Sequence, residues 1–493
     1  MKKMNLLVMS LVSAAALSFS SCSNNDDLTG GGTQSQADGV YMTLKISGAT
    51  SHGTRTGVTA DKTTAENGNS DESTIKEGML YIYDGNTCVF RKVITADMFK
   101  TAPTQTTAGE TKPIKVAVTG AITTNKAYNV YFLANNTSVD DPIAATSIFT
   151  STTGGKNFAT AQNFVMFNQN DGTKEAAHST VTFTDAAKSE ATPAAAGEIK
   201  LDRVVARIDN PSFAETVTTV TPATDTKTSI NVADVVAGIT YEGYAVSNLN
   251  NNSYVKQNWD QKFETLTVKW GEPKYYLPKS DYGTLYNAAG LDNFGTESWK
   301  YAFENTTTDV DEATAVYFKV KVTLTETANN ASDFKDGTFY RYDGRLYTSI
   351  KAIYDDAATG AISNPFTETS SITPADVVAK ISDADGKLTT DEAKLAQFRE
   401  TYKIEVYRQG VMYYRWAISD NAYKPFVASE TTHTYSVLRN SIYRLNVTKV
   451  SEIGKDVPNG PEPDDPIKNP NFYMNVTVSI NPWVLNAQPI ELK

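Results

Sequence analysis

Two segments at opposite ends of the chain share one alternating pattern of apolar and polar residues. The first runs from Val40 to Ile46 and the second from Met474 to Ile480. Such period-two alternation predicts a strand with one buried face and one face in water. The residues predicted to be buried are Val40, Met42, Leu44 and Ile46 in the first strand, and Met474, Val476, Val478 and Ile480 in the second. Because the two sets have similar volumes, both strands are expected to fit a similar groove.

Short runs of the same kind recur through both halves of the chain, with turn signals between them. Asp343-Gly344 marks a hairpin, and 374–398 is the best helix candidate, with a turn at Asp385-Gly386. This pattern predicts an all-β fold in the main, with β-sandwich domains and few helices. The other predicted strands cover residues 79–83, 88–90, 114–118, 128–134, 163–167, 199–208, 241–246, 266–270, 315–324, 339–347, 402–407, 412–418 and 442–450.

The segment before the last strand is rich in proline and acidic residues. Residues 454–471 are expected to stay extended and cannot join a central strand, so their length suits an arm that carries the last strand to a neighbour. Pro482 is expected to interrupt the strand, with Trp483 and Leu485 beginning a second short one. The pattern leaves open an alternative, in which this terminal strand folds back onto its own domain.

The first strand is followed by a polar stretch, residues 47–73, that has almost no large apolar side chain and is not expected to build a core. Arg55 lies within it between Gly53 and Gly57, and an exposed, glycine-flanked backbone is where proteases cut. Cleavage after Arg55 would make Thr56 the new N-terminus and release the first strand. The alternative is that Arg55 is a solubilising charge in a loop.

The N-terminal segment has the features of a secretory signal peptide. Two lysines precede a mostly apolar stretch at 6–19, and Ser20-Ser21 stand directly before Cys22. A cysteine at this place is typical of a lipobox, whose thiol is acylated, although Phe19 replaces the usual leucine. Ordinary signal cleavage beside an incidental cysteine is the alternative. No later stretch is long enough to span a membrane, so a lipid would be the anchor.

The bulk composition narrows the function. A length of 493 residues predicts two or three domains, and a net charge of -11 without a Lys/Arg stripe argues against a nucleic-acid partner. Three scattered histidines and two cysteines offer no metal or nucleophile cluster, so neither an enzyme nor a cofactor is expected. Residues 383–387 depart from calcium-loop spacing and indicate a turn. The aromatic residues at 413, 414 and 416 are interpreted as core rather than as a sugar platform.

Several patches of the chain together form a recognisable set. They are Ser20-Ser21-Cys22, the isolated Arg55, 200–207, 413–416, 439–447, the Pro/Asp tether and 473–478 with Pro482-Trp483; Asn440-Ser441-Ile442-Tyr443 and Pro482-Trp483 are the most specific of them. This set resembles the fimbrillins of type V pili, and within that family the shaft subunit of the short fimbriae. The resemblance implies export as a lipoprotein, loss of the N-terminal strand after an arginine, and exchange of strands between subunits that each have two transthyretin-like β-sandwich domains.

Together these observations predict five segments: a signal peptide and lipobox at 1–22, a propeptide with the removable strand at 23–55, sandwich domains at 56–197 and 198–453, and the tether with donor strands at 454–493. The predicted function is a structural pilin that forms head-to-tail polymers with copies of itself by protease-triggered donor-strand exchange, in adhesive fimbriae at the cell surface. Expected partners are tip and anchor subunits, an arginine-specific protease and, through the precursor's lipid, the outer membrane. The alternatives are a tip or anchor subunit of the same pilus, or a monomeric surface lipoprotein that binds glycan or protein.

Overall fold

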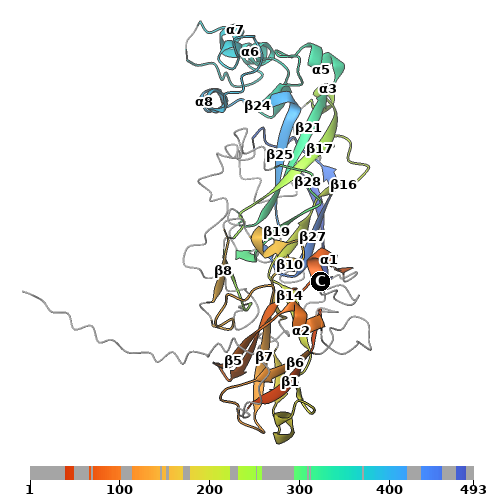
Figure 1. Cartoon of the computed structure of the whole chain (residues 1–493). Helices are drawn as coiled ribbons and strands as arrows, with labels where there is room; N and C mark the ends of the chain where they lie inside the picture. The colour runs from red at the N-terminus through yellow and green to blue at the C-terminus, as the bar shows by residue number, and fades with distance from the viewer. Residues whose placement is uncertain are drawn as a thin grey trace, which may run out of the picture.

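The structure is a computed structural model that describes residues 39–48, 66–67, 70–100, 114–144, 147–151, 155–169, 178–222, 231–250, 252–257, 294–307, 310, 313–368, 371–418, 435–457 and 474–484. The described residues form mainly β-structure with few helices, as predicted. Figure 1 shows an elongated molecule with β1 near one end and helices α6, α7 and α8 at the other. Among the described residues, no helix is both long enough and apolar enough to cross a membrane.

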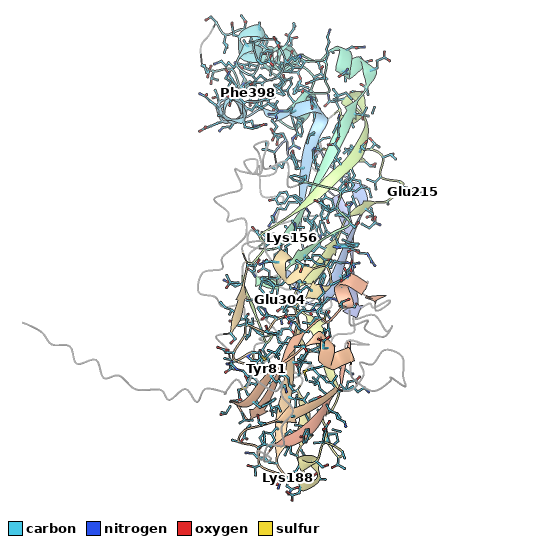
Figure 2. All side chains as sticks on the ribbon, in the orientation of Figure 1. Tyr81, Lys156, Lys188, Glu215, Glu304 and Phe398 are labelled. Carbon is cyan, nitrogen blue, oxygen red and sulfur yellow. The ribbon has the colours of Figure 1, made fainter. Side chains whose placement is uncertain are left out.

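The first sandwich packs a three-stranded sheet, order β13-β1-β6, against a seven-stranded sheet, order β2-β14-β11-β7-β4-β5 with β12 beside β7. Alternating apolar residues on both sheets close one core, where Tyr81 is fully buried (Figure 2). The strands are β1 (Val40–Leu44), β2 (Ile46–Gly48), β4 (Gly78–Asp84), β5 (Thr87–Ile94), β6 (Ile114–Val118), β7 (Ala127–Ala134), β11 (Met166–Asn168), β12 (Ser179–Thr182), β13 (Ala194–Ala195) and β14 (Ile199–Arg203).

The second sandwich packs a six-stranded sheet, order β19-β15-β27-β28-β3 with β16 beside β27, against a three-stranded sheet, order β17-β21-β25. Val316, Phe318 and Val320 of β21 point into its core. The strands are β3 (Glu66–Asn67), β15 (Ala206–Asp209), β16 (Ser212–Phe213), β17 (Val236–Ser247), β19 (Trp299–Ala302), β21 (Ala315–Leu324), β25 (Val411–Ala417), β27 (Ser441–Val450) and β28 (Met474–Val484). The prediction of two sandwiches is therefore confirmed.

A third hydrophobic core, which the sequence pattern had not revealed, lies in the helical module. This module comprises β22 (Phe339–Tyr342), β23 (Arg345–Tyr347), β24 (Glu405–Tyr407), α6 (Ile350–Ala358), α7 (Pro374–Ala379) and α8 (Glu392–Tyr402). Thr373 and Asp376 form a capping box at the start of α7, and Asp391 caps α8, so the helix candidate at 374–398 is two helices joined by a turn. Figure 2 shows Phe398 inside this module.

The remaining short elements connect these three parts. They are α1 (Ser70–Ser73), α2 (Ala96–Lys100), β8 (Ile148–Thr150), β9 (Ala159–Thr160), β10 (Asn163–Phe164), α3 (Val232–Val235), β18 (Asn252–Tyr254), β20 (Asn305–Thr307), α5 (Glu326–Asn330), β26 (Tyr435–Val437) and the 3-10 turns η1 (Lys156–Phe158), η2 (Asp185–Lys188) and η4 (Arg408–Gly410). The pairs β8–β18, β9–β10 and β20–β26 each form a two-stranded sheet.

Several local predictions are confirmed and others are wrong. Asp343 and Gly344 both have positive φ and turn β22 into β23, and a turn follows Asp383, whose carboxylate accepts hydrogen bonds from the backbone N–H groups of residues 385 and 387. The strand predicted at 402–407 is wrong at its start, because Tyr402 ends α8 and Lys403 adopts a left-handed conformation. The predicted strand at 266–270 lies outside the described residues.

Candidate assembly sites

The first strand occupies a slot in the middle of a sheet. β1 pairs antiparallel with β6, from Val40 opposite Val118 to Leu44 opposite Ile114, and parallel with β13 on its other edge. The side chains at 40, 42, 44 and 46 are 5%, 0%, 1% and 0% exposed, which is the alternation that the sequence predicted. Removing β1 would therefore open a slot with a strand on each side and an apolar floor.

The same segment also contributes to the second sheet of that sandwich. The predicted single strand from 40 to 46 is two strands, because the chain leaves the first sheet at Lys45 and continues as β2, which pairs parallel with β14. The carbonyl of Lys45 accepts a hydrogen bond of 2.9 Å from the backbone N–H of Ile199. Nine consecutive residues, 40–48, thus close both sheets of the first sandwich.

The last strand lies on an edge of the second sandwich. β28 pairs antiparallel with β27 from Met474 opposite Val450 to Pro482 opposite Ser441, with one bulge in β27 between Val447 and Lys449. The ladder with β27 ends at Pro482, as expected, and the next two residues pair parallel with β3. These two residues belong to the same strand, which continues to Val484, rather than beginning a second one.

The structure places the apolar alternation of the last strand, Met474, Val476, Val478 and Ile480, within β28 together with Trp483. Four other predicted site residues, Cys22, Arg55, Thr56 and Leu485, lie outside the described residues. Lipid attachment, cleavage, strand removal and strand donation therefore stay predictions.

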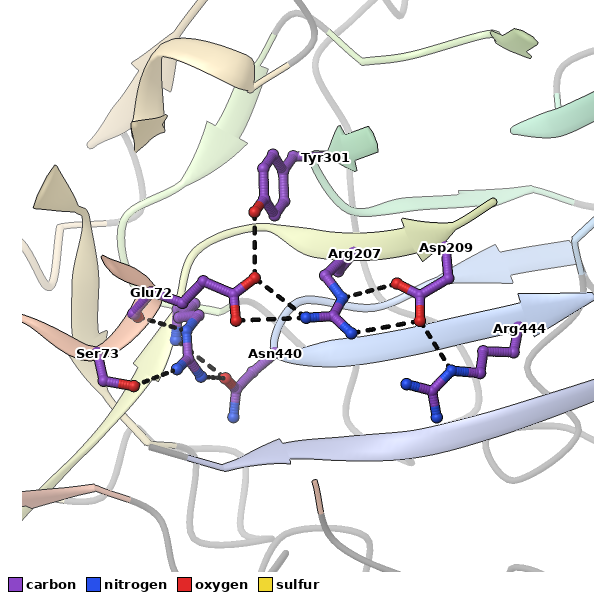
Figure 3. Close-up of polar contacts among 8 residues, drawn as sticks. Glu72, Ser73, Arg207, Asp209, Tyr301, Asn440 and Arg444 are labelled. Atoms are coloured by element: carbon purple, nitrogen blue, oxygen red, sulfur yellow. Dashed lines mark hydrogen bonds and ion pairs between the residues drawn. The ribbon is translucent and has the colours of Figure 1, made fainter. Parts of the chain in front are cut away.

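A polar cluster that sequence reasoning missed lies between the two sandwiches. This junction cluster consists of Glu72, Ser73, Arg203, Arg207, Asp209, Tyr301, Asn440 and Arg444 (Figure 3). It surrounds the point where the chain passes from Val205, in the first core, to Ala206, in the second, and the first core also takes in Val255, Phe303 and Ile442. The domain limits drawn from the sequence remain a prediction.

Arg203 is fully buried at the centre of this crossing. Its Nε donates to the carbonyl of Glu72 at 2.9 Å, Nη2 to Ser73 Oγ at 3.2 Å and Nη1 to Asn440 Oδ1 at 3.3 Å. One guanidinium therefore joins α1, β14 and the turn before β27. These segments are far apart in the sequence, so a pattern search along the chain cannot link them.

Glu72 is the main acidic partner of the junction cluster and is 1% exposed. Its Oε1 accepts hydrogen bonds of 3.1 Å from both Arg207 Nη1 and Tyr301 Oη. Arg207 also binds Asp209 through Nε at 2.7 Å, and Asp209 accepts a further bond of 2.8 Å from Arg444. A short helix in the polar stretch after the first strand is thus tied into the core, contrary to the expectation for residues 47–73.

Burial and charge pairing set the protonation of the two inner arginines. Burial away from water lowers the pKa of Arg203 to about 9, so its guanidinium stays charged at neutral pH. For Arg207, burial lowers the pKa, but the hydrogen bond and charge of Asp209 outweigh that effect and the pKa is raised overall. Charged donors that are hydrogen-bonded on several sides favour a fixed arrangement of the two sandwiches.

The turn before β27 is held in the same way. Asn440 has a φ of 55° and donates to Asp202 Oδ1 at 2.6 Å, while Arg439 pairs with Glu304 at 2.8 Å and both side chains are buried. Residues 439 and 440 belong to a patch that the sequence had singled out without a role. In the structure these two residues form the turn that leads into β27, the strand that pairs with β28.

Comparison with known protein families finds a match in the C-terminal part of the chain. Residues 405–489 match the family model described as "Major fimbrial subunit protein type IV, Fimbrillin, C-terminal". The chain carries a fimbrillin C-terminal region. This match confirms the fimbrillin resemblance, and that family consists of structural subunits of cell-surface fimbriae. The matched region includes β25, β27 and β28.

Several solved structures are similar to this chain at low sequence identity. A fimbrilin (FimA) from Porphyromonas gingivalis W83 has a TM-score of 0.42 and 14% identity, covering 90% of this chain and 98% of that one. A putative cell adhesion protein from Parabacteroides distasonis ATCC 8503 has a TM-score of 0.39 and 12% identity, with coverages of 92% and 98%. The tip fimbrial protein Mfa3 from Porphyromonas gingivalis, truncated at its C-terminus, has 0.33 and 10%, with coverages of 90% and 100%. No curated protein sequence matches the chain significantly.

Proposed function

We propose that this chain is a shaft fimbrillin that polymerises into adhesive cell-surface fimbriae by protease-triggered donor-strand exchange. The observation that carries the proposal is the position of β1, a central strand supplied by the segment that precedes Arg55. A strand at that place fills the slot until cleavage separates it from the domain. The last strand of another subunit then replaces it, with main-chain hydrogen bonds giving affinity and alternate side chains giving register.

The lengths of the two strands support one particular register. Residues 474–482 of β28 make the ladder with β27, and the resident segment 40–48 is also nine residues long. With Met474 in the place of Val40, Ile480 takes the place of Ile46. Pro482 then falls on the last residue of β2, where its missing N–H costs least. Trp483 lies beyond the slot in this register.

Burial in the slot, rather than the number of paired residues, favours exchange over the resting position. On β27, residues 474–482 form a nine-residue ladder, and the next two residues pair with β3. In the slot, the same residues would take the places of 40–48, of which five pair with β6, two with β13 and three with β14. Burying four alternate side chains there contributes roughly 6–12 kcal/mol, at about 1.5–3 for each, before the cost of ordering the strand.

The contact between subunits would be head-to-tail, since the donated strand and the slot are different surfaces. Such a contact does not close on itself and therefore propagates as a filament. In this proposal the precursor is held at the outer membrane by a lipid on Cys22, and an arginine-specific protease cuts after Arg55. Tip and anchor subunits would end the filament.

The deciding experiment compares two pairs of substitutions in β28. Val476→Asp with Val478→Asp puts charges where the slot is apolar, whereas Thr477→Asp with Ser479→Asp changes the alternate face and serves as the matched control. After cleavage, electron microscopy should show short or absent filaments for the valine variant and filaments for the control. Removal of residues 471–493 should likewise leave a folded chain that accepts a strand but gives none. Filaments of wild-type length from the valine variant would refute strand donation.

A further inference from the structure

The segment that follows β27, residues 451–457, is held against the rest of the subunit by hydrogen bonds of residues 452–456. We call it the arm root; its last four residues, 454–457, were expected to belong to the tether, but they are bound to the subunit. Its residues are buried apart from Lys455, which is half-buried, and Ile453 is 0% exposed. A segment that merely led into a flexible tether would not need such burial.

Four successive backbone carbonyls of the arm root accept a hydrogen bond. The carbonyl of Glu452 accepts from Tyr414 Oη at 2.8 Å, that of Ile453 from Arg341 Nη1 at 3.1 Å, that of Gly454 from Tyr407 Oη at 2.8 Å and that of Lys455 from the backbone N–H of Tyr413 at 2.8 Å. The donors come from β22, β24 and β25. Arg341 and Tyr407 of the helical module and two donors of β25, in the second sandwich, therefore hold the main chain itself, independently of the root's own side chains.

Asp456 adds a charged bond at the end of the root. Its carboxylate is 1% exposed, pairs with Arg399 of α8 and accepts a hydrogen bond of 2.9 Å from the backbone N–H of Val406. Gly454 passes so close to β25 that a Cβ atom there would lie 2.4 Å from the carbonyl oxygen of Tyr413. Both observations describe a segment fitted to one position.

We propose that the arm root is the fixed point from which the C-terminal arm leaves the subunit, with the helical module as its mount. This proposal rests on the proposed function. The module lies at the end of the molecule opposite β1 (Figure 1), so the root lies on the side that a stacked neighbour's slot would face. Tension along a filament would then enter each subunit at 451–457 rather than peel β27 from its sheet.

The root also sets the reach of the arm. With the root fixed, the connection to the donated strand is residues 458–473, or sixteen residues. Freeing the root would add its seven residues, which span about 20 Å more at roughly 3 Å per residue when the chain is extended. A longer connection lowers the effective concentration of the donated strand and lets the spacing between subunits vary.

The test loosens the root and measures filament spacing. Asp456→Ala and Gly454→Ala attack the root directly, and Tyr407→Phe removes a single hydroxyl. Lys380→Ala is the matched control, because it removes an exposed ion pair with Glu368 of the same module, 2.9 Å long, without touching the root. Hydrogen exchange in the uncleaved chain should show faster exchange at 451–457 in the three root variants, with α8 still protected.

After cleavage, filaments of the root variants should show an axial repeat that is longer by up to about 20 Å or broader in distribution, whereas Lys380→Ala keeps the wild-type repeat. If the root variants exchange faster at 451–457 but keep the wild-type axial repeat, the proposal that the root sets the subunit spacing is wrong, and strand donation is unaffected. Unchanged exchange at 451–457 in all three variants would overturn the clamp itself. Absence of wild-type filaments would refute donor-strand exchange, and with it this role.

Discussion

Leu44 offers the most direct test of whether the first strand is held in its slot by its buried side chains. The side chain is 1% exposed, belongs to the first core and lies opposite Ile114 of β6. In the uncleaved chain, Leu44→Ala lowers the stability of the whole sandwich. After cleavage, the strand is a separate peptide, and the same loss weakens its hold on the slot.

The size of the effect follows from the burial. A buried Leu→Ala change costs about 2–5 kcal/mol, through lost transfer energy and the cavity left behind. At about 1.4 kcal/mol for each factor of ten, the cleaved strand should bind roughly 30- to 4,000-fold more weakly. Thr43→Ala is the matched control, since Thr43 is half-buried on the opposite face and its hydrogen bond with Ala196 uses only the backbone carbonyl.

The assay cleaves each precursor with an arginine-specific protease and follows two signals. Size-exclusion chromatography with mass spectrometry measures how much of the peptide that contains β1 stays with the domain, and light scattering measures the onset of polymer. Leu44→Ala should lose the peptide sooner and polymerise earlier than the wild type, and Thr43→Ala should behave like the wild type. Equal retention in both variants would refute the reasoning, because the buried face would then not hold the strand.

Three further predictions concern the two ends and the junction cluster. Cys22→Ala should abolish partitioning of the precursor into detergent, and normal partitioning would count against a lipid anchor. Arg55→Ala should give a folded monomer without filaments, in which N-terminal sequencing finds no chain that begins at Thr56; normal filaments would disprove maturation at this site. Glu72→Ala removes the buried carboxylate that accepts from Arg207 and Tyr301, while Arg207 keeps its pair with Asp209, so it should lower the free energy of unfolding by about 2–3 kcal/mol, seen as an earlier thermal transition, whereas Tyr301→Phe should cost about 1 kcal/mol. Equal melting of the Glu72 and Tyr301 variants would contradict the importance of the ion pair.

The sequence pattern located strands well where alternation and burial act together. The range 315–324 agrees with β21 at both ends, because β-branched and aromatic side chains alternate there and face the second core. The pattern failed at Tyr402, whose aromatic ring suggested a strand. Its ring lies 5.0 Å from that of Phe398 in the same helix, so tertiary packing decided the outcome. α6 escaped notice, although Ser349 caps it and Ile350 and Ile353 supply its buried face.

The candidate sites also differ in how far the sequence pattern could predict them. The alternate residues of the first and last strands could be found from spacing alone. Where the last strand rests could not, because the edge of β27 and the slot of β1 suit the same apolar alternation. The junction cluster was out of reach, since Glu72 and Arg207 are separated by 135 positions and meet only through the fold. The arm root escaped for the same reason, because its partners lie on three different strands and one helix.

The docking of α1 between the two sandwiches has a practical consequence for imaging. If cleavage follows Arg55, the fourteen residues from Thr56 to position 69 precede a segment that stays fixed by Glu72 and Ser73. Fourteen residues reach at most about 50 Å, so the new amino terminus stays within that distance of α1, between the two sandwiches. A gold particle or fluorophore attached to that amine would mark every subunit once, at a constant phase along the filament. Such a label would serve as a ruler for polymer growth.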